Sequence, residues 1–116
     1  MNRSVNLIVF PVRDIESAKS LYTKLLGVEP YYAGPYYAGY RVGGLEIGLD
    51  PNGHSKGQNG AIPYWDVDDI RAATQSLVDA GGTLAQDVTE VGGGLQIAWV
   101  KDSDGSIIGL RQAPAA

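Results

Sequence analysis

Apolar positions along this chain follow the same pattern twice. An apolar, β-branched run over residues 5–12 predicts a strand, and a similar run over 61–67 predicts another. Apolar residues at helical spacing follow each run at matching offsets: Ile15, Ala18, Tyr22 and Leu25, then Ile70, Ala73, Leu77 and Ala80. A supersecondary unit that occurs twice in tandem restricts the fold to a few architectures.

Residues that start and stop helices bound the predicted elements. Asp14 and Asp69 suit helix N-caps, and Gly27 and Gly82 close the two helical patterns. We expect helices over 15–26 and from 70 up to residues 81–82. Further strands are expected over 28–32, 36–42, 45–49, 83–88, 95–100 and 106–111. The predicted fold class is therefore α+β: one domain, 1–116, made of two βαβββ modules, 5–50 and 60–112, with a linker between them.

Side chains in a strand alternate between two faces, so each sheet has a face under its helix and an opposite face. Ile8, Phe10 and Val12 suit the helix side, as do Leu45, Ile47 and Leu49 in the later strand of the same module. The opposite face carries small or apolar residues and one carboxylate: Leu7, Val9, Glu46, Gly48, Ile62, Tyr64, Ile107 and Gly109. Because small residues on a strand leave room for a close approach, we interpret this face as the wall of a ligand cavity. Tyr40 and Trp99 complete the predicted ligand-binding set, although alternation leaves the facing of Gln96 and Trp99 open.

Composition excludes several classes of function. The 116 residues carry a formal net charge of −4, which argues against nucleic acid as the main partner because phosphate binding needs a basic face. No apolar run is long enough to span a membrane, and no signal peptide precedes the first strand. The absence of cysteine excludes disulfides and thiolate chemistry. We therefore expect a cytoplasmic protein.

Several short motifs occur in order along the chain. They read Pro-Val-Arg-Asp at 11–14, Ser-Leu-Tyr at 20–22, Leu-Gly at 26–27, Val-Asp-Asp at 67–69 and Lys-Asp-Ser-Asp-Gly-Ser at 101–106. With these motifs in duplicated modules, the chain resembles the vicinal oxygen chelate superfamily. That superfamily includes glyoxalase I, methylmalonyl-CoA epimerase, extradiol dioxygenases, fosfomycin-resistance enzymes and bleomycin-binding resistance proteins. The resemblance covers residues 5–112. It implies sheets curved round a cavity and a two-fold dimer with residues 31–40 near its interface.

The resemblance also implies positions for metal ligands. Metal-dependent members carry a His in the first strand of each module and a Glu, His or Gln in the last strand, where a divalent metal chelates two substrate oxygens. In this chain the first-strand positions are Leu7 and Ile62, and the last-strand positions are Gly48 and Gly109. None of these side chains can ligate a metal. We therefore predict no metal, no other cofactor and no catalytic residue.

Other candidate residues have two interpretations each. Glu46 could anchor a cationic or hydroxyl group of a ligand, or act as a general base, or simply pair with Arg41 or Arg111. The tyrosines of residues 31–40 could stack a flat ligand, or pack in the sheet and in a dimer contact. His54 is the only histidine, and it is expected to be solvated in the polar linker.

Three functions remain open. The first is a metal-free small-molecule-binding protein of the glyoxalase/bleomycin-resistance type, which would sequester an aromatic or cationic antibiotic-like compound. The second is a glyoxalase-like lyase, isomerase or dioxygenase with a non-standard site, against which the missing histidines count. The third is a structural or regulatory module with no ligand. We adopt the first, with a small-molecule ligand and a homodimer as the expected partners, because it needs no catalytic constellation.

Overall fold

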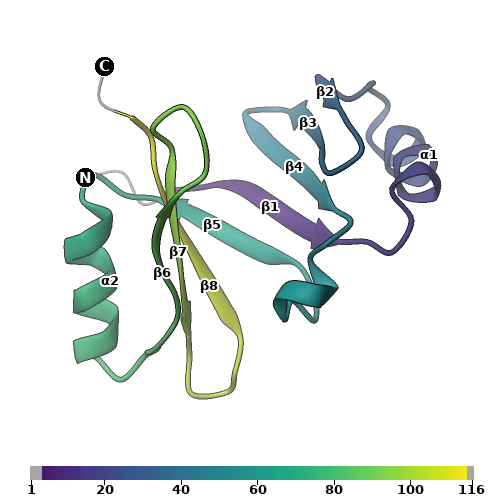
Figure 1. Cartoon of the computed structure of the whole chain (residues 1–116). Coiled ribbons are helices and arrows are strands. Elements are labelled where there is room, and N and C mark those ends of the chain that lie inside the picture. The colour runs from purple at the N-terminus through teal and green to yellow at the C-terminus, as the bar shows by residue number, and fades with distance from the viewer. Residues whose placement is uncertain (1–3, 115–116) are drawn as a thin grey trace. The chain divides into compact units, whose positions relative to one another are not determined.

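The computed structural model describes residues 4–114, and the chain divides into two compact units. The N-terminal unit comprises Asn6–Ile62, and the C-terminal unit comprises Pro63–Ala116 together with Met1–Val5. The segment that the sequence placed between the modules thus belongs to the N-terminal unit, where it contains a short 3₁₀ helix, η1 (His54–Lys56). Figure 1 shows the elements of both units.

The N-terminal unit contains four strands and one α-helix. Along the chain these are β1 (Val5–Pro11), α1 (Ile15–Leu26), β2 (Tyr32–Ala33), β3 (Ala38–Val42) and β4 (Leu45–Asp50). The strands lie in the order β2-β3-β4-β1, with β1 parallel to β4 and the other pairs antiparallel. The last strand of the module therefore returns beside the first.

The C-terminal unit repeats this arrangement. Its elements are β5 (Ile62–Asp66), α2 (Ile70–Asp79), β6 (Thr83–Glu90), β7 (Gln96–Lys101) and β8 (Ile107–Gln112). The strands lie in the order β5-β8-β7-β6, with β5 parallel to β8 and the other pairs antiparallel. Both modules are βαβββ, so the predicted α+β class is confirmed. No described helix is long and apolar enough to cross a membrane.

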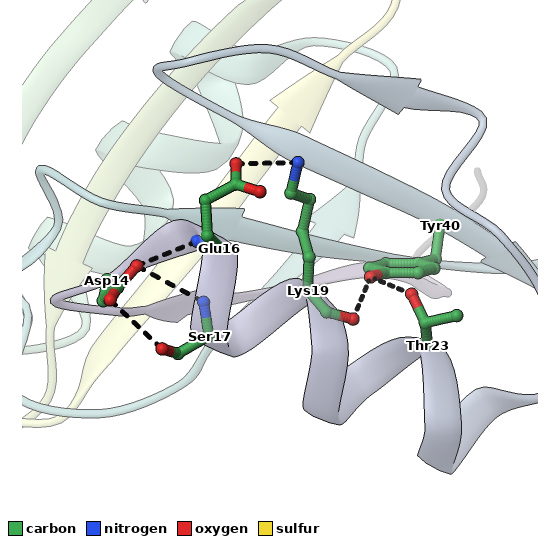
Figure 2. A network of polar contacts seen from close by, with 6 residues as sticks. All are labelled: Asp14, Glu16, Ser17, Lys19, Thr23 and Tyr40. Atoms are coloured by element: carbon green, nitrogen blue, oxygen red, sulfur yellow. Dashed lines mark hydrogen bonds and ion pairs between the residues drawn. The ribbon is translucent and has the colours of Figure 1, made fainter.

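Capping residues begin and end α1 as predicted. The Asp14 carboxylate accepts hydrogen bonds from the amides of Glu16 (3.0 Å) and Ser17 (3.3 Å) and from the Ser17 hydroxyl (3.1 Å), as Figure 2 shows. These bonds, above all the one from the Ser17 amide, hold the pKa of Asp14 below its ordinary value. Gly27 ends the helix at φ 73°, a left-handed conformation that glycine adopts without strain.

The second helix begins as predicted but ends earlier. Asp69 accepts a hydrogen bond from the Ala72 amide, and the Ile70 amide donates to the Gln112 side chain at 2.7 Å. The helix stops at Asp79, short of the predicted glycine pair, because Gly81 already has a φ of 111°.

Of the strand predicted over residues 28–32, only Tyr32 lies in a strand, the two-residue β2. Pro30 has no amide hydrogen, so it cannot donate the backbone hydrogen bond that would extend β2 towards residue 28. Backbone pairing starts where the Tyr31 amide donates to the Gly39 carbonyl (2.9 Å) and ends where the Gly34 amide donates to the Tyr37 carbonyl (2.9 Å). The rest of this segment is a loop.

Each helix covers one face of its own sheet, and the predicted strand facing is confirmed there. In the N-terminal unit the side chains under α1 are those predicted for the helix side: Ile8, Phe10, Val12, Leu45, Ile47 and Leu49. In the C-terminal unit the residues packed together with α2 are Trp65, Val67, Ile70, Ala73, Leu77, Val88, Ala98, Ile108 and Leu110. Burial of these apolar faces is the main stabilising term of both modules.

Tyr40 is an exception, and its predicted place in the cavity wall is wrong. The pairing of β3 with β4 puts Tyr40 opposite Ile47, so both side chains lie on the face under α1. The Tyr40 side chain is fully buried. Its hydroxyl shares a hydrogen bond with Thr23 Oγ1 (2.8 Å) and donates to the Lys19 carbonyl (3.2 Å), as Figure 2 shows. The register of the hairpin decides this facing, and alternation along one strand does not reveal it.

Candidate functional site

The remaining predicted ligand-binding residues lie on the face of each sheet away from its helix, which we call the helix-free face. In the N-terminal unit, the parallel pairing of β1 with β4 puts Leu7 beside Glu46 and Val9 beside Gly48. Neighbouring residues of both strands pack under α1, so these four side-chain positions share the opposite face.

In the C-terminal unit, Gly109 of β8 lies at the centre of the helix-free face. It pairs with Tyr64 of β5 on one side and with Trp99 of β7 on the other. Ile107 shares this face through strand alternation, as does Ile62, the first residue of β5, at which the N-terminal unit ends. The predicted residues of this unit are therefore brought onto one face of one sheet.

The structure decides the facing of Trp99, which alternation left open. Its neighbour Ala98 is buried in the cluster under α2, so Trp99 points to the helix-free face and Gln96 shares the side of Ala98. The Trp99 indole Nε1–H donates a hydrogen bond to the Tyr64 hydroxyl at 2.7 Å. This bond joins two buried aromatic side chains, at 5% and 4% exposure, into a fixed pair.

On the helix-free face of each unit, a glycine is covered by a tyrosine of the same unit. A Cβ atom at Gly48 would overlap the hydroxyl of Tyr37, and a Cβ at Gly109 would come within 2.6 Å of Tyr64 Cδ2. The sequence suggested that these glycines leave room for a ligand; instead they leave room for the protein's own rings. Tyr37 was not among the predicted site residues. The repeated Tyr-Tyr-Ala-Gly at residues 31–34 and 36–39 was the available signal.

Glu46 is the carboxylate predicted on the helix-free face, and in the N-terminal unit it contacts Tyr31 and Arg41. Its Oε2 accepts a hydrogen bond from the Tyr31 hydroxyl at 3.3 Å, and its Oε1 lies 3.7 Å from Arg41 Nε. The Arg41 guanidinium also lies 4.0 Å from the centre of the Tyr31 ring. Of the two arginines considered as partners, Arg41 therefore forms the ion pair with Glu46.

Arg111 pairs elsewhere, within the C-terminal unit. Its Nε donates to Asp66 Oδ1 at 2.8 Å and its Nη2 donates to Asp66 Oδ2 at 3.4 Å. These two residues are opposite each other in the register of β5 and β8, two positions beyond Tyr64 and Gly109, so the pair belongs to the same face. A bidentate pair of this kind orients both groups. It was not predicted, because its partners are 45 residues apart in the sequence.

The exposure of the site residues varies. Leu7, Val9 and Ile62 are buried, whereas Glu46, Tyr37 and Ile107 are only half-buried. A ligand that comes to the helix-free faces therefore meets the half-buried groups first. His54 is exposed in η1, as the solvated interpretation expected.

Nearly the full length of both modules matches one family. The sequence model of the Glyoxalase/Bleomycin resistance protein/Dioxygenase superfamily matches residues 4–110. The chain belongs to this superfamily. A search of curated proteins found no match for this superfamily member.

Solved structures share its fold at low sequence identity. An NAD-dependent benzaldehyde dehydrogenase from Legionella pneumophila is 20% identical with a TM-score of 0.76, covering 92% of this chain and 97% of that chain. A glyoxalase/bleomycin resistance protein/dioxygenase superfamily member from Vibrio splendidus 12B01 is 20% identical with a TM-score of 0.73, covering 95% and 100%. Methylmalonyl-CoA epimerase from Mycobacterium tuberculosis is 17% identical with a TM-score of 0.70, covering 97% and 88%. These likenesses establish the fold and leave the activity open.

The residues of this superfamily member do not fit the metal that the family resemblance implies. The four corresponding positions are Leu7, Ile62, Gly48 and Gly109, which offer no donor atoms, and tyrosines cover the two glycines. Among the described residues, no group of three His, Cys, Asp or Glu side chains is placed to hold a metal ion. We derive no chemical step through a metal.

Proposed function

We propose that this superfamily member is a metal-free protein that binds a small molecule on the helix-free faces of its sheets. The observation that carries the proposal is the hydrogen-bonded pair of Trp99 and Tyr64, which holds two rings in place on one face. The two rings are buried and have already lost their conformational entropy, so they form a rigid base beneath the half-buried groups that a flat apolar ligand meets first. A few polar groups then suffice to orient the ligand.

On the helix-free face of the N-terminal unit, Glu46 indicates the chemical class of a ligand. Its ion pair with Arg41 is long, at 3.7 Å, and the Arg41 side chain is 65% exposed. Ion pairs this exposed contribute only about 0–1 kcal/mol, so a cationic or hydroxyl group of a ligand can replace Arg41 at little cost. The net charge of −4 also attracts cations. We therefore propose a flat, mainly apolar, antibiotic-like compound with a cationic or donor group, which the protein sequesters without chemical change.

A homodimer in the cytoplasm is part of this proposal. The segment that contains β2 presents three exposed aromatic side chains: Tyr31 at 46%, Tyr32 at 54% and Tyr36 at 74% exposure. Exposed apolar surface of this kind supports an interface, and two-fold dimers are the commonest assemblies. Light scattering at micromolar concentration should give the mass of two chains. The mass of one chain would remove the dimer from the proposal and leave ligand binding to be judged separately.

The test of binding is a thermal-shift screen of purified protein against divalent metals and flat aromatic cations, because a true ligand raises the apparent stability by mass action. Calorimetry with any hit then compares three variants. For a ligand on the helix-free face of the N-terminal unit, Glu46→Gln should weaken binding by about 1–3 kcal/mol, the scale of a lost charged hydrogen bond; for a ligand on the helix-free face of the C-terminal unit, Tyr64→Ala should weaken binding. Glu29→Gln is the matched control, since Glu29 is an exposed carboxylate of the same unit. Unchanged affinity in both site variants would contradict the proposed faces.

Elemental analysis tests the metal-free part of the proposal. The protein should contain no stoichiometric zinc, nickel, manganese or iron, because the four family positions supply no donor atoms. About one metal per chain, removed by a chelator together with an enzymatic activity, would instead support the glyoxalase-like lyase, isomerase or dioxygenase.

A further inference from the structure

An apolar groove of about 300 Å³ lies on the helix side of the C-terminal unit. Its lining comes from β5, β8 and α2: Trp65, Val67, Ile108, Leu110, Ala73, Ser76 and Leu77. Trp65 and Tyr64 are consecutive in β5 and point to opposite faces, so the sheet separates this groove from the Tyr64–Trp99 pair. The groove is therefore distinct from the site proposed above.

The two modules differ at this place, which explains why the groove exists. In the N-terminal unit, Phe10 of β1 meets Tyr22 of α1, with ring centroids 5.3 Å apart, and the rings fill the space between strand and helix. The matching residues of the C-terminal unit are Trp65 and Leu77. Helix α2 packs mainly on β6, β7 and β8, and its Leu77 has no ring to extend over β5. Helix α2 therefore leaves part of the Trp65 side chain uncovered, and this uncovered part lines the groove.

We propose that this groove binds a small, flat aromatic molecule that carries one hydroxyl or amine group at its edge. The Trp65 indole supplies a flat wall for stacking, and the other lining side chains are apolar except Ser76. The Ser76 hydroxyl makes no hydrogen bond to another described residue, so it is available to the polar group of a ligand.

The size of the groove supports a small molecule rather than a protein partner. Its volume is at the lower end of the roughly 300–1,000 Å³ of small-molecule sites. Seven residues line it, whereas a stable protein interface uses about 20–30 residues on each side. A fused two-ring compound with one hydroxyl group matches both the volume and the lining.

The experiment is a titration of the intact ¹⁵N-labelled protein with 2-naphthol, observed through the two tryptophan indole N–H signals in ¹H–¹⁵N spectra. The chain has two tryptophans, and a Trp65→Phe variant assigns their signals. We expect the Trp65 signal to shift in a saturable way, and any shift of the Trp99 signal, which reports the probe on the other face, to follow a separate binding curve. No shift of Trp65 up to the solubility limit of the probe, or shifts of both signals along one binding curve, would overturn the proposal.

Two neighbouring alanines of α2 provide a matched pair of variants. Ala73 lines the groove, whereas Ala72 is exposed and lies outside it, so the same added volume has different consequences. Ala73→Leu should reduce the affinity for 2-naphthol at least tenfold, and Ala72→Leu should leave it unchanged. Wild-type affinity in Ala73→Leu would overturn the proposal.

A third variant keeps the test valid if Ala73→Leu is poorly folded. Ser76→Ala removes only the hydroxyl at the groove and should weaken 2-naphthol binding about 2–10-fold, the effect of one ordinary hydrogen bond. Unchanged affinity in this variant would contradict the assigned role of Ser76. A shift of the Trp65 signal with protein concentration alone would put a second copy of the chain in the groove and overturn the small-molecule proposal. Glu46→Gln should not affect the shift of the Trp65 signal, because Glu46 does not line the groove, and this separates failure here from failure of the proposed function.

Discussion

The substitution Gly48→Ala, which adds one methyl group, tests whether Tyr37 needs the space that Gly48 leaves. A Cβ atom there would overlap the Tyr37 hydroxyl and come within 2.7 Å of its Cζ, closer than such atoms pack. Gly48 is paired with β1 on one side and β3 on the other, so its backbone is held and the ring must move. We expect Gly48→Ala to lower the free energy of unfolding by about 1–3 kcal/mol, the usual cost of overpacking.

The same geometry predicts how a second substitution changes this cost. In a Tyr37→Ala background the added methyl group no longer meets the ring. Gly48→Ala should then be neutral or stabilise by up to about 1 kcal/mol, because alanine in a strand loses less backbone entropy than glycine. The coupling free energy between the two substitutions is therefore about 1–3 kcal/mol or slightly more.

Urea unfolding of the four proteins, followed by circular dichroism, measures this coupling. Gly60→Ala is the control, because no atom lies within 4 Å of a Cβ at Gly60 and its free energy of unfolding should change by less than about 0.5 kcal/mol. A coupling below about 0.5 kcal/mol would refute the reasoning, since distant independent sites show no more than that.

Gly109 should behave differently, which sharpens the test. A Cβ there would lie 2.6 Å from Tyr64 Cδ2 and also 2.9 Å from the Pro63 carbonyl oxygen. A backbone oxygen in a strand cannot move aside as a ring can. Gly109→Ala should therefore destabilise the protein by about 1–3 kcal/mol, and Tyr64→Ala should rescue only part of that loss.

Three further predictions follow from polar groups. Gln58 is 2% exposed and its Oε1 has no hydrogen-bond partner among the described residues, so Gln58→Met should raise the free energy of unfolding by about 1 kcal/mol in urea titrations. The hydrogen bonds from Ser17 lower the pKa of Asp14 in the folded protein, so the Asp14 carboxylate stabilises the fold fully above its unfolded pKa of about 3.8. This stabilisation is lost as the pH falls through the folded pKa. Asp14→Ala should therefore lower the Tm at pH 7, and the difference in Tm between variant and wild type should shrink at pH 2. Tyr64→Phe should cost about 1–3 kcal/mol in urea titrations because the buried Trp99 N–H loses its partner, and an unchanged midpoint would show that another group satisfies it.

The sequence determined the elements and their duplication, because local chemistry decides both. Asp14 and Gly27 begin and end α1 as predicted, since a carboxylate before a helix and a glycine after it act on adjacent backbone groups. Alternation along β1 and β4 correctly assigned the residues under α1, because each apolar face needs its helix. The family resemblance, carried by short motifs in order, was also correct.

Only the tertiary structure decided what occupies the candidate site. Alternation gives two faces for each strand, but the hairpin register that put Tyr40 under α1 depends on which residues of β3 and β4 meet. Tyr37 packs over Gly48, 11 positions away in the sequence. Trp99 donates its hydrogen bond to Tyr64, 35 positions away. Such contacts arise from the packing of several strands at once, where the space left by one residue is filled by another that no local pattern identifies.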